Sequence, residues 1–161
     1  MLRTITLGSL KLSCIQTAAR HGLNTFISML LQHLSTESKV SLLLQRSPLN
    51  GGKTALHMAC DTSQISVVNT MVDLIPNADR FRLIIATDEN ENTVLHSAVA
   101  SGDKSLVLAL NIDQLTGEQQ YAAMVKENKN GLRTIDLAKQ QNFQEIDHYL
   151  DDLLQESAIR K

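Results

Sequence analysis

The sequence has no tryptophan, two tyrosines and three phenylalanines among its 161 residues. Hydrophobic residues still make up 43% of the chain, so its apolar side chains are mostly Leu, Ile, Val, Ala and Met. This mixture favours helices that pack closely against one another, and the chain is long enough to bury a core of its own. We therefore expect an all-α protein with a single domain over residues 1–161.

Cysteine is also scarce, with Cys14 and Cys60 the two present. Two cysteines do not make a disulfide framework, and these are not spaced like paired zinc ligands. The dispersed histidines His21, His33 and His148 have no Glu or Cys at ligand spacing either. We expect no metal and no cofactor, and a reduced cytoplasmic or other intracellular setting.

Long apolar runs are missing as well. None approaches the roughly 20 residues that span a bilayer, and the start MLRTITLGSL lacks the apolar core of a secretory signal. A soluble protein without membrane insertion is expected. One alternative concerns the first residues: with Arg3, Lys11 and Arg20 and no acidic residue before Glu37, they also have the composition of a mitochondrial transit peptide.

The formal net charge of −2 gives no reason to expect nucleic acid as a ligand. The charge is nevertheless unevenly placed, because acidic residues gather in the third quarter of the chain. They are Glu89, Glu91, Asp103, Asp113, Glu118 and Glu127. This distribution predicts a bipolar electrostatic field along the molecule.

An alanine recurs along the chain at spacings of 41, 39 and 40 residues. It closes the motifs in IQTAARHG, LHMACDTS, LHSAVASG and IDLAKQQN, as Ala18, Ala59, Ala98 and Ala138. Four residues later comes a residue suited to a helix C-terminus and tight turn: Gly22, Ser63, Gly102 or Asn142. Apolar residues at i, i+4 spacing follow each turn. Each unit therefore predicts a helix, a tight turn and an antiparallel helix.

The segments between these helix pairs predict a short third helix in each of the first three units. They are STESKVSLLLQRSPLN, PNADRFRLIIATDE and LTGEQQYAAMVKEN. Each opens with a cap or turn residue near an acidic residue and continues with apolar residues at roughly helical spacing.

The motifs TALHMA and TVLHSA resemble the Thr-Pro-Leu-His-x-Ala core of ankyrin repeats. The resemblance covers four units, at about residues 8–46, 47–87, 88–127 and 128–154. It implies a helical repeat solenoid with an extra short helix in each repeat, which is longer than the roughly 33 residues usual for ankyrin. Two features depart from the family: Ala55, Val94 and Thr134 replace the motif proline, and each unit is enlarged. In their enlarged units the repeats are similar to those of ankyrin effector proteins of intracellular bacteria.

His57 and His96 stand three residues after Thr54 and Thr93. The resemblance implies that these four residues form a structural brace, in which each ring bonds the Thr hydroxyl and neighbouring backbone. A buried histidine is tolerated when both ring nitrogens have partners. In the competing interpretation Cys60 is a nucleophile and His57 its base.

The resemblance also implies that the protein binds a partner protein through the concave face of the inner helices and through the turns between units. The inner-helix positions are Arg20, His21, Asp61, Thr62, Ala100, Ser101, Gln140 and Gln141. The turn positions are Asn50, Lys53, Glu89, Asn90, Asn92, Lys129 and Leu132. Arg20 is the best anchor candidate, because arginine is favoured at interface hot spots.

We therefore expect a monomeric, non-enzymatic protein-protein interaction module, with a bacterial effector acting on a host protein in the host cytosol as its most specific form. The alternative is an architectural, self-assembling subunit, since the FISMLLQHL segment of the first unit leaves apolar residues to be covered by Met1–Lys11 or by a partner. An enzyme with a Cys-His site is the third class. The last unit has a polar face next to its apolar stripe and is expected to cap the C-terminal end.

Overall fold

The computed structural model describes residues 7–159, and the side chains of residues 14–158 within them. This part of the chain is helical and contains no strand, which confirms the predicted all-α class. The helices are α1 Leu7–Arg20, α2 Asn24–Gln32, α3 Thr36–Leu43, η1 Pro48–Asn50, α4 Ala55–Asp61, α5 Ile65–Asp73, α6 Asn77–Ile84, α7 Val94–Ala100, α8 Lys104–Ala109, η2 Ile112–Gln114, α9 Gly117–Val125, α10 Thr134–Gln140 and α11 Gln144–Ile159. The first six residues of the segment proposed as a transit peptide lie outside the described residues.

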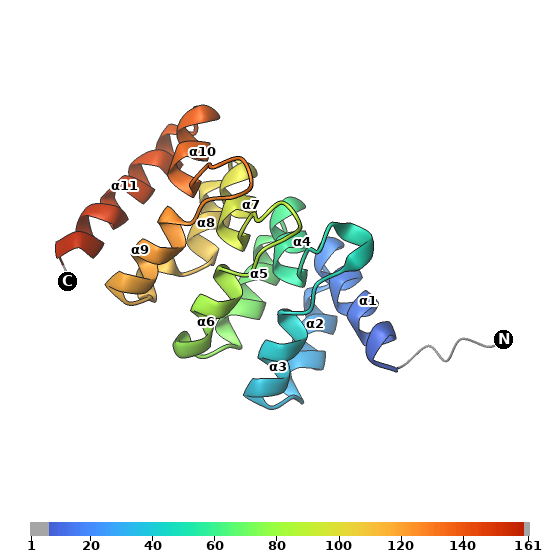
Figure 1. Cartoon of the computed structure of the whole chain (residues 1–161). Helices are drawn as coiled ribbons and strands as arrows, with labels where there is room; N and C mark the ends of the chain where they lie inside the picture. Colours follow the sequence, from blue (N-terminus) through green and yellow to red (C-terminus); the bar gives the residue numbers. More distant parts are fainter. Residues whose placement is uncertain (1–6, 160–161) are drawn as a thin grey trace.

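Helices three places apart along the chain pack side by side (Figure 1). The inner row consists of the inner helices α1, α4, α7 and α10, and a second row consists of α2, α5, α8 and α11. A third row consists of α3, α6 and α9, and α9 also packs against α11. The chain thus advances from α1 at one end of the molecule to α10 and α11 at the other.

The turn after each inner helix has the backbone conformation that the sequence predicts. Gly22, Ser63, Gly102 and Asn142 have φ values of 70°, 53°, 72° and 58°, the left-handed region that ends a helix. At Gly102 the glycine is also required by space, because a Cβ there would stand 2.9 Å from the ring of Phe143. The turn therefore brings the next helix back beside the first.

The four recurrent alanines are buried, each with 1% or less of its surface exposed. They lie in the inner row, and their small side chains allow close packing of its helices. Most of the core around them is aliphatic, as the scarcity of aromatic residues predicts. Three of the few aromatic side chains, Phe81, Phe143 and Tyr149, pack at its margin.

A helix is present in each of the three segments predicted to hold one: α3, α6 and α9. Ser35 caps α3 by accepting from the backbone of Ser38, and Thr116 caps α9 in the same way. At α6 the opening residue is a turn residue, Pro76, which occupies the N-cap position and makes no side-chain cap bond. The ring of proline fixes its own backbone angle and so allows the helix to begin without one.

Arg80 of α6 is a buried cation that the sequence pattern did not reveal. Its Nε atom donates to the carbonyl oxygens of Val72 and Ile75, both at 3.1 Å, near the end of α5. Its Nη1 atom donates to Oε1 of Gln114 at 2.7 Å. Arg80 therefore satisfies carbonyl groups at a helix end and links the second unit to η2 in the third.

The two ends of the molecule differ in polarity. In α11 the side chains of Ile146, Leu150 and Leu153 are buried, whereas His148 and Asp152 are exposed, as expected of an end that faces water. At the other end α2 and the residue before it expose three large apolar side chains, Leu23, Phe26 and Met29. The segment Met1–Lys11, named as a cover for this end, lies outside the described side chains.

None of the helices in the described part of the chain has the length and hydropathy needed to cross a bilayer.

Candidate functional site

Both ring nitrogens of His57 have partners. Nδ1 lies 2.8 Å from Oγ1 of Thr54 and 3.3 Å from its backbone nitrogen, while Nε2 lies 3.0 Å from the carbonyl oxygen of Asn92. Thr54 is the N-cap of α4, so the first contact fixes the start of that helix. The second contact reaches the turn that precedes α7 and joins two consecutive units.

His96 repeats this arrangement one unit later. Its Nδ1 atom lies 2.7 Å from Oγ1 of Thr93 and 3.2 Å from the backbone nitrogen of Thr93. Its Nε2 atom lies 3.0 Å from the carbonyl oxygen of Leu132, in the turn that precedes α10. This geometry supports a bracing role for both histidines.

These contacts determine the tautomer of both rings. The carbonyl oxygens of Asn92 and Leu132 can only accept, so Nε2 carries the proton and Nδ1 accepts from the threonine backbone. Burial lowers the pKa of both His57 and His96, which favours this neutral form. Protonation of Nδ1 would remove the acceptor that the threonine N–H group needs.

The turns before α7 and α10 are shaped by Asp88 and Asn128. Oδ1 of Asp88 accepts from the backbone nitrogens of Asn90 and Asn92 at 2.8 and 2.9 Å. Oδ1 of Asn128 accepts in the same way from Asn130 and Leu132, at 2.9 and 3.1 Å. An acceptor side chain at this place satisfies the N–H groups of a tight turn.

Successive turns are joined to one another by backbone hydrogen bonds. The nitrogen of Glu89 donates to the carbonyl of Gly51 at 2.8 Å, and that of Lys129 donates to Asn90 at 3.0 Å. The Nδ2 group of Asn128 also donates to Oδ1 of Asn92 at 2.8 Å. The turns therefore form one edge with a fixed order of side chains.

The structure brings six of the predicted partner-binding residues together around one hollow of about 370 Å³. They are Lys53, Asp61, Asn92, Ala100, Leu132 and Gln140. Lys53 forms an ion pair with Asp61 across part of it. This hollow lies along the inner helices and turns of the second to fourth units, and it presents both charges and amide groups. We call it the second hollow, because another lies in the first unit.

Three other predicted residues, Arg20, His21 and Asn50, line a separate hollow of about 540 Å³ between α1 and the turn before α4. The guanidinium of Arg20 donates to Oδ1 of Asn50 at 3.3 Å. Arg46 and Leu49 also line this first hollow, and 95% of the surface of Leu49 is exposed. The predicted surface is therefore divided into two parts.

The remaining predicted residues line neither of these hollows. Thr62 and Gln141 are exposed at the ends of their helices, and Ser101 belongs to another hollow with Gly102 and Phe143. Three more are exposed on the edge formed by the turns: Glu89, Asn90 and Lys129. Thr62 and Ser101 donate their hydroxyl groups to helix carbonyls, at 2.8 and 2.7 Å, which satisfies them locally.

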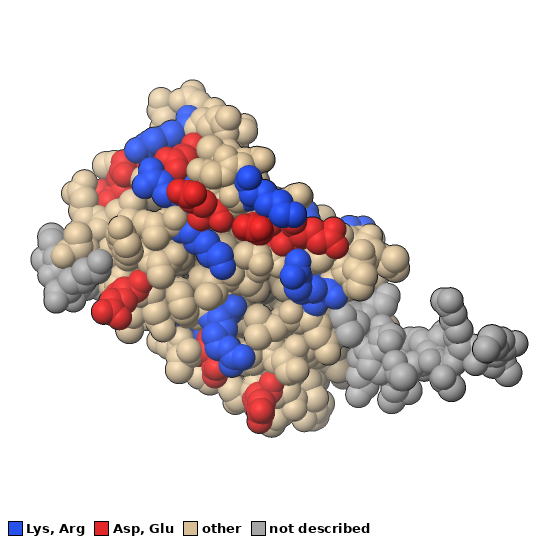
Figure 2. Space-filling view, in the orientation of Figure 1, with Lys and Arg blue, Asp and Glu red and all other residues tan. Residues whose placement is uncertain are grey.

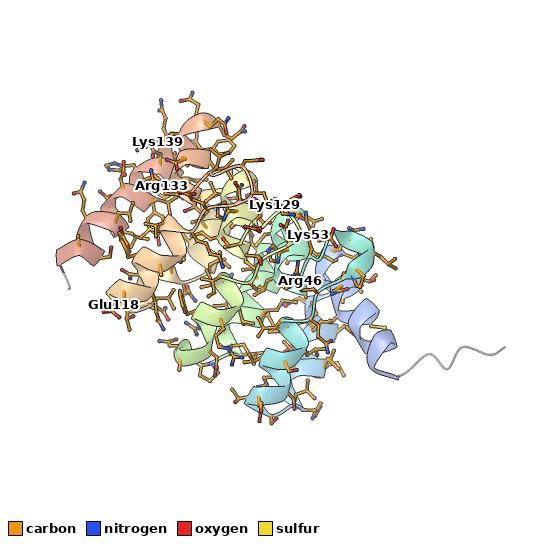
Figure 3. All side chains as sticks on the ribbon, viewed as in Figure 1. Arg46, Lys53, Glu118, Lys129, Arg133 and Lys139 are labelled. Atoms are coloured by element: carbon orange, nitrogen blue, oxygen red, sulfur yellow. The ribbon has the colours of Figure 1, made fainter. Side chains whose placement is uncertain are left out.

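Charge is distributed in bands over this edge (Figure 2). Acidic side chains gather in a band across the face, and Lys and Arg side chains flank it on both sides. Arg46, Lys53 and Lys129 lie along the edge formed by the turns (Figure 3). Acidic and basic side chains therefore lie close to one another on this face. The simple bipolar field expected from the sequence does not describe it.

Several residues of the two hollows were missed by the sequence prediction. Asp88 and Asn128 occupy the same place as Ser47 in the first turn, 41 and 40 residues apart, and this spacing could have revealed them. Arg46 and Leu49 carry no such signal. Arg46 precedes, and Leu49 lies in, the turn closed by the backbone bond from Ser47 to Lys53, which is two residues longer than the turn closed by the bond from Asp88 to Asn92.

The arrangement around Cys60 disfavours the Cys-His interpretation. Its thiol is completely buried, and burial raises its pKa far above the usual value. Both ring nitrogens of His57 are engaged with Thr54 and Asn92, so neither is left for a thiol. Among the described residues, no three His, Cys, Asp or Glu side chains are grouped so that they could hold a metal ion.

No protein-family model and no curated protein matches the chain. Among solved structures, it is similar to a chain in the crystal structure of the yeast ribosomal protein Rps3 in complex with its chaperone Yar1. The TM-score is 0.65 at 22% sequence identity, over 86% of this chain and 89% of that chain. At this level of identity the likeness concerns the fold alone.

Proposed function

We propose that this chain is an ankyrin-type solenoid of four enlarged units whose inner face and turns bind another protein. One observation carries the proposal: six side chains chosen from the sequence for exposure to a partner line a single hollow, while the braces beside it repeat from unit to unit. A repeated framework with variable side chains on it is typical of repeat proteins that bind other proteins.

The mechanism is docking onto a surface that is ordered before the partner arrives. The braces of His57 and His96 and the bonds between turns fix the edge of the hollows. A partner therefore loses little of its binding free energy to ordering this surface. Mixed charges around the hollows favour a polar interface that selects its partner by electrostatic complementarity.

The similar solved structure supports this proposal. That structure is a complex between a ribosomal protein and its chaperone, so a chain of comparable fold occurs in an assembly of proteins. The narrower role as a bacterial effector in host cytosol rests on the enlarged units alone and stays a prediction.

Affinity capture from a eukaryotic cell lysate tests the proposal. The native chain is compared with a variant carrying Arg20→Glu, Asp61→Arg and Gln140→Glu, which changes both hollows. A control variant, Arg82→Glu, Glu118→Arg and Gln155→Glu, makes the same charge changes on exposed helix faces elsewhere. Circular dichroism establishes that all three are folded.

We expect a protein that the native chain and the control retain and the hollow variant loses. Equal retention by all three would contradict binding at these hollows.

Self-assembly is a second candidate, because Leu23, Phe26 and Met29 leave 52%, 45% and 60% of their surfaces exposed at one end. Sedimentation over a range of protein concentrations distinguishes the two. A mass that rises with concentration in the native chain, and stays monomeric in Phe26→Glu, would favour self-assembly over a monomeric binder.

A further inference from the structure

The first hollow differs from the second in its charge. Arg20 at the end of α1 and His21 just after it line this hollow on one side, and Arg46 lines it from the segment before α4. The described residues that line it include no Asp or Glu, whereas Lys53 and Asp61 neutralise each other in the second hollow. The first hollow is therefore the cationic one.

Neither arginine forms an ion pair with a carboxylate of the described residues. Arg20 donates to the amide oxygen of Asn50, and Nε of Arg46 donates to the carbonyl of Gly52 at 3.1 Å. Each guanidinium is thus held by a neutral acceptor and retains N–H groups for a further acceptor.

Leu49 adds an apolar element at the rim of the same hollow. With 95% of its surface exposed, it is the most exposed of the large apolar side chains in the described part of the chain. It follows Pro48 at the start of η1, where the turn presents it to solvent. A ligand that covers Leu49 gains from removing this surface from water.

We propose that the first hollow binds an acidic segment of a partner protein in which an apolar side chain lies between carboxylates. The carboxylates pair with Arg20 and Arg46, for which a planar guanidinium is suited, and the apolar side chain covers Leu49. This inference rests on the proposed protein-binding function and names the chemistry of the partner at one of its two hollows.

Nucleic acid suits this hollow less well, although arginine also binds phosphate. The next turn places the acidic residue Glu89 beside the hollow, since its backbone is bonded to Gly51 and its Cγ atom would stand 3.0 Å from a Cβ at Gly52. A long polyanion would run onto this carboxylate and onto exposed Glu91. A short acidic segment ends before them.

A peptide array tests the proposal. Its members are short Gly/Ser peptides with a central Leu, Phe, Met or Ala, flanked by Asp in every arrangement, and matched sets carry Lys or Ser in place of Asp. The strongest acidic member is then labelled and titrated by fluorescence anisotropy. The variants are Arg20→Gln with Arg46→Gln, and Leu49→Ser alone; Arg82→Gln with Lys139→Gln is the control for loss of two exposed cations elsewhere.

We expect Asp peptides to bind at least about tenfold more tightly than Lys peptides, and the Arg20→Gln, Arg46→Gln variant to lose about tenfold in affinity. The control should bind like the native chain, and Leu49→Ser should weaken binding only of peptides with an apolar centre. Equal binding of Asp and Lys peptides, or no loss in the double arginine variant, would overturn the inference. The inference would also be overturned if single-stranded oligothymidine displaced the labelled peptide at a lower concentration than the unlabelled acidic peptide does.

This outcome is separable from that of the proposed function. A protein captured equally by the native chain and by the Arg20→Gln, Arg46→Gln variant would leave protein binding intact and refute the acidic segment.

Discussion

The two middle units and the last unit begin their inner helices with different chemistry at the same place. In the middle units the third helical position holds His57 or His96, whose ring joins its own threonine cap to the turn of the next unit. In the last unit this position holds Asp136, which accepts from the backbone of Arg133 at 3.1 Å and pairs with its side chain. The first arrangement is buried and spans two units; the second is exposed and stays local.

The difference follows from what comes after each unit. A histidine at this place is useful because its Nε2–H group finds a carbonyl in the following turn. After α10 the described chain continues only into α11, so no turn presents a carbonyl there. The first unit is intermediate: Gln16, two residues before Ala18, donates to the carbonyl of Gln45 at 3.3 Å. This position therefore serves the contact between units more than the helix itself.

Removing a brace should have the largest effect. His57→Ala or His96→Ala leaves a buried carbonyl and a buried N–H group without partners, so each is expected to lower the free energy of unfolding by about 1–3 kcal/mol. Urea denaturation followed by circular dichroism measures it. His148→Ala removes an exposed histidine and should change little; a loss there equal to that of His57→Ala would contradict the bracing role.

The second largest effect is expected from acid, which should lower the stability of the middle units. Burial lowers the pKa of His57 and His96 in the folded state, so the unfolded chain binds more protons near their ordinary pKa. Their contribution to stability is complete above about pH 6.5 and is lost progressively as the pH falls from there towards the lowered pKa. Melting temperatures measured between about pH 7.5 and pH 5 should therefore decrease.

The same series on His57→Gln with His96→Gln provides the control, since glutamine keeps a polar side chain and does not titrate. A decrease of equal steepness in this variant would assign the pH dependence to other groups.

Gln16→Ala should have a smaller effect than either histidine variant. The side chain of Gln16 makes one long hydrogen bond at 3.3 Å, whereas His57 and His96 each form hydrogen bonds through both ring nitrogens. We expect a loss of about 0.5–1.5 kcal/mol in urea denaturation. An effect as large as that of His96→Ala would mean that one hydrogen bond at this position stabilises the fold as much as a histidine whose two ring nitrogens are both bonded.

Asp136→Ala should lower the melting temperature less than Gln16→Ala, because an exposed ion pair contributes little to stability. Much of this small effect should disappear at high salt, which screens exposed charges. A large decrease that is insensitive to salt would show that the last unit depends on this residue as the middle units depend on their histidines.

The smallest effect is expected from transferring the brace. Arg133→Thr with Asp136→His recreates the Thr and His pattern in the last unit without a following turn to receive Nε2–H. No gain in melting temperature over the native chain is expected. A clear stabilisation would show that the histidine acts mainly within its own helix, and would reverse the interpretation of the comparison.

The features that the sequence predicted are those that depend on local periodicity. The spacing of the alanines located the inner helices, and Gly22 or Ser63 located the turns, because helix period and left-handed backbone are readable from neighbouring residues. The braces were predictable for a related reason, since Thr and His recur together. The division of the predicted surface was not, because it depends on how far apart Arg20 and Asp61 come to lie.

Residues that act across units were the ones missed. Arg80 reaches from α6 to the end of α5 and to Gln114, and no pattern in the sequence marks a single arginine for this purpose. Leu49 appears in the sequence as an ordinary apolar residue, and only its turn exposes it. Such roles are set by the meeting of two segments, and neither segment alone indicates them.

The order of packing also bears on how the chain comes to be folded during synthesis. The close partners of α4 are α1, α5 and α7, all within the adjoining units, and the same holds for each inner helix in the described part of the chain. A helix pair that leaves the ribosome can therefore settle on the pair before it while later residues are still being added. On this view α11 settles on α8, α9 and α10 after all of these have formed.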